Sequence, residues 1–226
     1  MVCYPKYRKL PHGNKHHFQE EKLMLHKRMK KYISSELTSE ANKVEIYQEE
    51  KEFIKKYDLI SNDITIIDKD PKARFLDAYI ERGDKETEET LAVESFAFLE
   101  QPIDYLQKHM NEFIYIESNW LEIIGVDAIS LEVSDVFGTY DVMVGMQLQK
   151  KLEMSLKENL SKELDGDEAR FGMMFNQKDG MWDLNFALND VQGFHEEMSL
   201  EEACRLIYRF LFKLVERIEE GSKDVN

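Results

Sequence analysis

The clearest pattern along the chain is an alternation of apolar and polar positions between residues 168 and 189. Large apolar residues stand at every second position of two short runs: Phe171, Met173, Phe175, then Trp182, Leu184, Phe186 and Leu188. A period of two is typical of strands, and the Asp179-Gly180 pair between the runs is typical of a hairpin turn. The sequence therefore predicts a β-hairpin over about 168–189, with one apolar face that another layer must cover.

Helical spacing follows this hairpin. Ser199 and Glu202 form a capping-box pattern, and apolar residues then recur at every third or fourth position as far as Ile218, before Gly221. These signals predict an amphipathic helix over about 199–220. A second amphipathic helix is predicted over about 139–164, on the stripe Val142, Met146, Leu152, Leu156, Leu160 and Leu164.

The remaining patterns are weaker. Leu25, Met29, Ile33 and Leu37 have helical spacing, and helical segments are also predicted over 45–57 and from Asp84 to about Glu100. Strands are predicted over 63–67 and 127–135. We therefore expect an N-terminal helical arm over 24–60 and a single α+β domain over 61–226, with a small, mainly antiparallel sheet that includes the C-terminal hairpin and is packed by the amphipathic helices.

Residues 1–23 allow two interpretations. The segment 1–17 has no periodicity and contains two prolines, which is typical of a disordered tail. Alternatively, Gln19-Glu20-Glu21 can be encoded as a purine-rich ribosome-binding site shortly before Met24, in which case a bacterial protein begins near Met24 and the preceding residues are leader. The codons for residues 18–23 decide between these interpretations.

Composition and charge exclude several functional classes. The chain has 226 residues and a net charge of −15; residues 1–31 carry nine Lys and Arg against two Glu, and the remaining 195 carry 21 against 43 acids. An acidic body makes nucleic acid an unlikely partner, because phosphate binding needs clustered cations. No apolar run approaches the roughly 20 residues of a membrane span. With only two cysteines, Cys3 and Cys204, we expect a cytoplasmic protein.

Candidate chemistry is sparse, and no metal or cofactor motif is present. His195 and Glu196 lie in the segment between the hairpin and the last helix, where a histidine beside acids can act as a general base. Asp183, Asn185 and Asn189 project from the less apolar face of the hairpin, with Arg170 opposite them, and this polar face is the preferred candidate ligand site.

The leading functional expectation is a non-enzymatic, acidic, cytoplasmic protein that acts through protein contacts, as a regulatory or self-associating module. The alternative is a small hydrolase or transferase with a carboxylate–histidine site.

Overall fold

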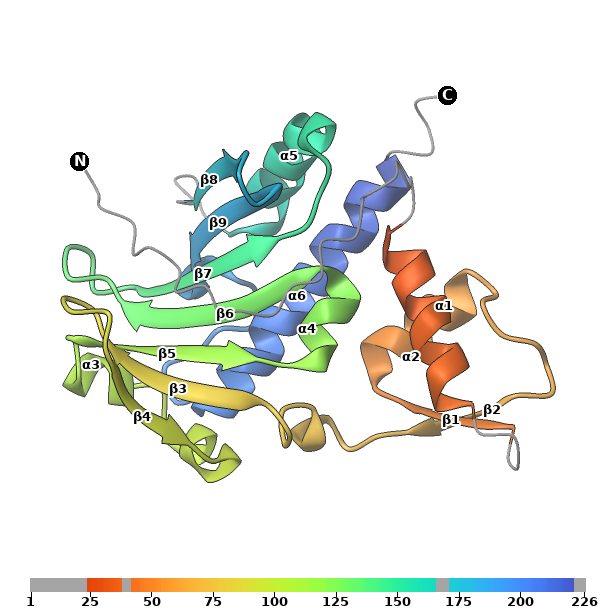
Figure 1. Ribbon diagram of the computed structural model, residues 1–226, viewed down its shortest axis with the longest axis horizontal. Helices are drawn as coiled ribbons and strands as arrows, with labels where there is room; N and C mark the ends of the chain where they lie inside the picture. Colours follow the sequence, from red (N-terminus) through yellow and green to blue (C-terminus); the bar gives the residue numbers. More distant parts are fainter. Residues whose placement is uncertain (1–23, 38–41, 166–170, 222–226) are drawn as a thin grey trace.

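The computed structural model describes residues 24–37, 42–165 and 171–221, and its main feature is a seven-stranded antiparallel sheet (Figure 1). In spatial order the strands are β4 (Thr90–Glu94), β3 (Tyr79–Asp84), β5 (Glu112–Glu117), β6 (Val126–Val133), β7 (Tyr140–Met146), β9 (Met181–Ala187) and β8 (Phe171–Asn176). The fold is α+β, as the sequence predicts.

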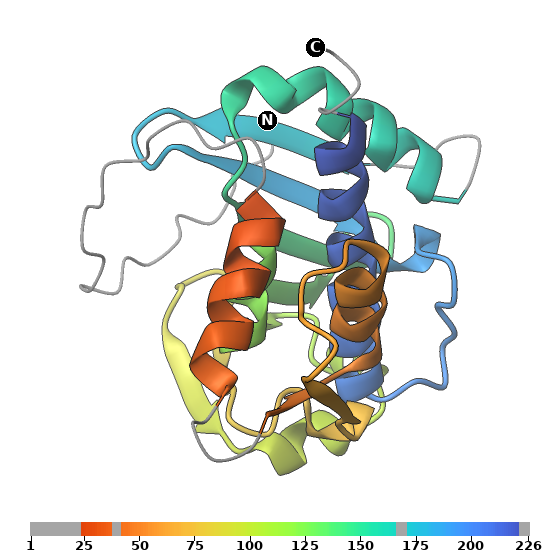
Figure 2. The same cartoon turned by 90° about the vertical axis from the view of Figure 1, so that its right-hand side faces the viewer.

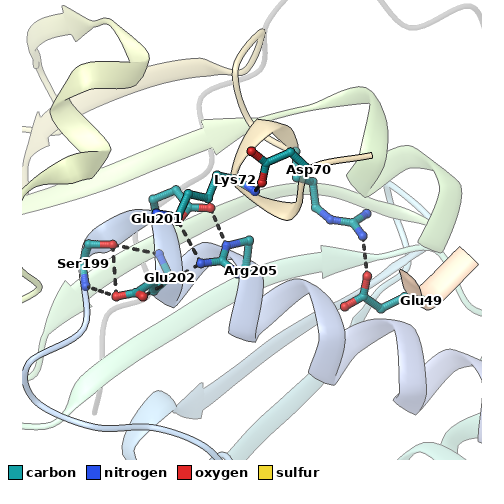
Figure 3. Close-up of polar contacts among 8 residues, drawn as sticks. Glu49, Asp70, Lys72, Ser199, Glu201, Glu202 and Arg205 are labelled. Atoms are coloured by element: carbon teal, nitrogen blue, oxygen red, sulfur yellow. Dashed lines mark hydrogen bonds and ion pairs between the residues drawn. The ribbon is translucent and has the colours of Figure 1, made fainter. Parts of the chain in front are cut away.

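One face of this sheet, which we call the inner face, packs against the long helix α6 (Leu200–Gly221) and against α5 (Glu153–Glu163), which lies beside α6 (Figures 1 and 2). Phe186 of β9 and Phe210 of α6 are in ring contact at 4.8 Å between centroids. The predicted capping box begins α6: the Ser199 backbone N–H donates to Glu202 Oε2 at 2.9 Å, and the Glu202 N–H donates to Ser199 Oγ at 3.1 Å (Figure 3).

The N-terminal part consists of α1 (Met24–Glu36), β1 (Lys43–Ile46), α2 (Gln48–Lys56) and β2 (Thr65–Asp68), and β1 and β2 form a separate two-stranded parallel sheet. Helix α1 packs against α4 (Asn119–Ile124) and α6. Its apolar stripe, Leu25, Met29 and Ile33, is buried in the same core cluster as the inner face of the large sheet.

A buried ionic cluster joins the N-terminal part to α6. Arg74, 2% exposed, follows the short 3-10 helix η1 (Pro71–Ala73) and donates to Glu50 Oε1 at 2.7 Å and to Glu49 Oε2 at 2.6 Å. Its guanidinium lies between the rings of Tyr47 and Tyr208, at 4.1 and 3.9 Å from their centroids. The Tyr208 hydroxyl also donates to Glu50, so one buried carboxylate links α2, η1 and α6.

The structure confirms the C-terminal hairpin, with residues 168–170 outside the described ranges, and confirms the helix over 199–220. The predicted helix over 139–164 is wrong in its first half, because residues 140–146 form β7 and the helix α5 begins only after η3 (Lys150–Leu152). Val142 and Met146 are four residues apart, a spacing that fits a strand as well as a helix. The buried residues Tyr140 and Val144 stand two residues before and two residues after Val142, so the buried positions of this segment recur with a period of two.

The predicted helix from Asp84 to Glu100 is also wrong. Residues 79–94 form the β3–β4 hairpin, and the 3-10 helix η2 (Phe96–Glu100) follows it. This segment lacks an apolar helical stripe, and its β-prone residues Thr90 and Val93 lie in an edge strand. The predicted helix over 45–57 is in fact β1 followed by α2. Among the described residues, no helix has both the length and the apolar character that a membrane crossing requires.

Candidate functional site

The second face of the seven-stranded sheet, which we call the outer face, is the candidate functional site. Residues that pair across antiparallel strands point to the same side of a sheet, so the strand register defines this face. One row of outward residues crosses all seven strands: Val93, Glu81, Tyr115, Ser130, Met143, Asn185 and Gly172. Within the described ranges, no helix lies over this face (Figures 1 and 2).

On the outer face, side chains from neighbouring strands lie over two glycines. The Phe113 ring occupies the space beside Gly83, where an added Cβ would come within 2.2 Å of it. In the same way, the Asn185 side chain covers Gly172, with Oδ1 at 2.3 Å from the position of an added Cβ. A partner at these positions would therefore contact the Phe113 ring and the Asn185 amide rather than the glycine backbone.

The charge of the outer face is negative. Its outward strand positions hold six carboxylates and, over the described strands, no Lys or Arg: Glu81, Glu117, Asp127, Glu132, Asp141 and Asp183. Lys85, in the turn after β3, lies at the border of the face. Its Nζ donates to Asp135 Oδ1 at 2.9 Å and is 3.8 Å from Glu132 Oε1.

Four of these carboxyls are held in surroundings that disfavour their charged form. Burial against neighbouring side chains raises the pKa of Glu132 above its usual range; the charge of Lys85 opposes this rise, and the nearby Asp141 adds to it. Burial likewise raises the pKa of Asp141, against a hydrogen bond from Thr139, and raises the pKa of Asp183. Burial also raises the pKa of Asp127, against hydrogen bonds from the Ala128 and Gly145 backbone N–H groups. Burial and neighbouring acids thus both disfavour the charged form of carboxyls on this face.

Local hydrogen bonds position the other acids. The Tyr115 hydroxyl donates to Glu117 Oε1 at 2.6 Å, and the Thr90 hydroxyl donates to Glu81 Oε1 at 2.7 Å. In the part of the chain that the structure describes, no group of three or more histidines, cysteines or acids is arranged to hold a metal ion. The arrangement is a broad acidic surface with aromatic and methionine side chains between the acids.

The structure brings two of the predicted ligand residues together on this face. Asp183 and Asn185 are both outward on β9, next to Gly145 and Met143 of β7. Asn189 instead lies in the 3-10 helix η4 (Leu188–Asp190), where its Oδ1 accepts a hydrogen bond from the Tyr140 backbone N–H at 2.8 Å. Arg170 lies outside the described residues.

The candidate catalytic residues lie on an exposed turn before α6. His195 is about half exposed, and its Nδ1 is 3.6 Å from Glu197 Oε2; Glu196 is exposed. The buried ionic cluster of Glu50, Arg74 and Tyr208 was not among the predicted sites, because its members are far apart in the sequence.

Sequence reasoning also missed most of the outer face. Glu132, Asp141 and Tyr115 come from three different strands, and the segment containing Asp141 was predicted to be helical. The alternation in 127–135 carried a usable signal, since it separates Ser130 and Glu132 from the apolar positions Ile129, Leu131 and Val133.

Comparison with known proteins gives no relative from which a site could be transferred. No protein-family model matches the chain, and neither the curated proteins nor the solved structures give a match. The functional argument consequently depends on the geometry of the outer face.

Proposed function

We propose that this protein acts without catalysis, by binding another protein through the outer face of its sheet, and that the partner presents a basic segment or patch. The observation that carries the proposal is the composition of this face: six carboxyl groups and no Lys or Arg at the outward positions of the described strands. A cationic partner that approaches this face offsets the repulsion among these carboxylates, and complementary charge also favours rapid and selective association.

The apolar residues of the outer face support a protein partner rather than a small cation. Val93 is 63% exposed and Met174 is 53% exposed, at opposite edges of the sheet, and Tyr115 and Met143 lie between them. Aromatic and methionine side chains are enriched in protein interfaces, and methionine adapts its shape to different partners. Seven strands about 4.8 Å apart give a surface about 30 Å wide, which accommodates an extended segment or a helix.

The cellular location is part of the same proposal. We assign the protein to the cytoplasm, where thiols stay reduced. Cys204, a free cysteine buried in α6, supports this assignment.

The test compares captured proteins between two variants of the full chain. The outer-face variant carries Glu132→Gln, Asp141→Asn and Asp183→Asn, which remove three charges with little change in shape. We expect a protein that wild type captures from its source cells to be lost with this variant, and its capture to weaken as salt is raised, because salt screens exposed charges.

The control variant removes the same charge from the other side of the molecule, through Glu153→Gln, Glu158→Gln and Asp165→Asn, at exposed positions on and just after α5. It should capture the partner as wild type does. Equal capture by the outer-face variant and the control variant would contradict the proposal, because the outer face would then make no difference to binding.

A further inference from the structure

Building on the proposed function, we infer that residues 1–18 of this chain bind the outer face of the same chain and compete there with the basic partner. These residues lie outside the described ranges, so the inference depends on their sequence, on where the chain enters α1 and on the charge of the face that they would meet.

The chain enters α1 between α6, where the Leu25 N–H donates to Glu219, and one end of the central strands of the sheet. Arg28, four residues after Met24, donates from Nη2 to Gln147 Oε1 at 2.8 Å, and Gln147 directly follows β7. The Arg28 guanidinium also lies beside Gly125, the residue before β6. The start of α1 is therefore close to the beginning of β6 and the end of β7, and Glu132 and Asp141 lie toward the opposite ends of these two strands, so the segment would have to extend along the face to reach them.

The segment has the charge and the length that this face requires. Residues 1–18 contain four cations, Lys6, Arg8, Lys9 and Lys15, and no acidic residue. Tyr4, Tyr7 and Phe18 add aromatic groups that can pack beside Tyr115 and Met143. Eighteen extended residues span about 60 Å, twice the width of about 30 Å estimated for the sheet.

Covalent attachment strengthens this contact. A segment tethered near its site has an effective concentration in the millimolar range, so even weak charge pairing keeps the face occupied. A partner then binds with an apparent affinity lowered by the fraction of chains whose face is occupied. The N-terminal segment thus raises the partner concentration that is needed to occupy the outer face. Any modification that removes the positive charge of the segment lowers this concentration.

A spin label on Cys3 of the full chain tests this contact directly. Cys204 is fully buried and burial raises the pKa of its thiol, so the label reacts selectively at Cys3. The readout is the intensity of ¹³C-methyl signals of methionine: Met143 and Met174 on the outer face, and Met154, 75% exposed on α5, as the control. We expect at least twofold loss of the Met143 or Met174 signal and little loss at Met154.

A tail variant with Lys6, Arg8, Lys9 and Lys15 replaced by Gln separates charge pairing from mere proximity. It should restore the outer-face signals and bind an added, unlabelled peptide of residues 1–18 at least fivefold more tightly than wild type does. An equal loss of signal at Met154 would overturn the inference, and so would a loss at Met143 and Met174 that is unchanged in the tail variant. The inference also fails if the signal is lost only when the ¹³C-labelled chain is mixed with a second, spin-labelled chain, because the contact would then be between two molecules.

Two further results distinguish this inference from the proposed function. Loss of the cellular partner in the outer-face variant, together with no signal loss from the label on Cys3, would leave the proposed function intact and overturn the occupancy by residues 1–18. A native chain from source cells whose first residue is Met24 would also overturn it, because the segment would then be leader.

Discussion

Replacing Arg74 by methionine should destabilise the protein strongly, because Arg74 connects the N-terminal part to α6. The side chain is 2% exposed and lies against Glu50, which is fully buried. Methionine keeps much of the length of the aliphatic stem and removes the charge, and therefore leaves the Glu50 carboxylate buried without its cation. Lys72→Met, at an exposed position in η1 two residues before Arg74, is the matched control.

The magnitude follows from the contacts that are lost. Arg74 makes hydrogen bonds of 2.7 and 3.1 Å to Glu50 and one of 2.6 Å to Glu49, and it stacks between two tyrosine rings. Removing one partner of a buried ion pair costs about 3–5 kcal/mol, because the other charge stays buried without its counterion. The lost hydrogen bonds and cation–π contacts are part of this cost, so we expect a loss of about 4 kcal/mol.

Urea unfolding followed by tryptophan fluorescence measures this effect, since the Trp120 ring is 5.2 Å from the Arg74 guanidinium. The free energy of unfolding should fall by about 4 kcal/mol for Arg74→Met and by less than about 0.5 kcal/mol for Lys72→Met. In the double variant Arg74→Met/Glu50→Met, the loss should be at least about 2 kcal/mol smaller than the sum of the single losses. Additive single losses, or a loss below about 1.5 kcal/mol for Arg74→Met, would refute the coupling.

Three smaller predictions concern the outer face and its neighbours. Because burial raises the pKa of the three carboxyls replaced in the outer-face variant, their contribution to stability is fully present below their unfolded pKa of about 4 and is lost as pH rises through the folded values. The melting temperature of the variant should therefore rise relative to that of wild type between pH 4 and 7. A difference in melting temperature that does not change with pH would contradict this. Asn189→Ala removes the acceptor of the Tyr140 N–H and should lower the free energy of unfolding by about 1–2 kcal/mol, measured in urea; no loss would show that the bond is dispensable. His195→Ala/Glu196→Ala, on an exposed turn, should change this free energy by less than about 0.5 kcal/mol, and a larger loss would reveal a packing role.

The sequence predicted elements well where local signals agree. In the C-terminal hairpin, the alternation, the Asp179-Gly180 turn and the capping box at Ser199 all specify the same arrangement, so β8, β9 and α6 were predicted correctly. In residues 139–164, the apolar spacing fits a strand and a helix equally, and pairing of β7 with β6 and β9 decides the outcome. Such pairing is a tertiary effect that a local pattern does not contain.

The candidate site was predicted in part for the same reason. Asp183 and Asn185 share one strand, so their common face follows from the period of two. Glu132 and Tyr115, on the same face, lie more than 50 residues earlier in the chain, and only the strand order of the sheet brings them onto one surface with Asp183 and Asn185. Arg74 and Tyr208 meet through the packing of α6 against the N-terminal part, for which the sequence carries no local signal.

The most direct test of the central claim is a ¹³C-methyl methionine spectrum of the full chain, recorded with and without the basic partner recovered by capture. Met143 and Met174 report on the outer face, and Met154 reports on α5 on the opposite side. We predict that the partner shifts or broadens the Met143 and Met174 signals and leaves Met154 unchanged. A partner that perturbs Met154 and leaves both outer-face methionines unchanged would contradict the account.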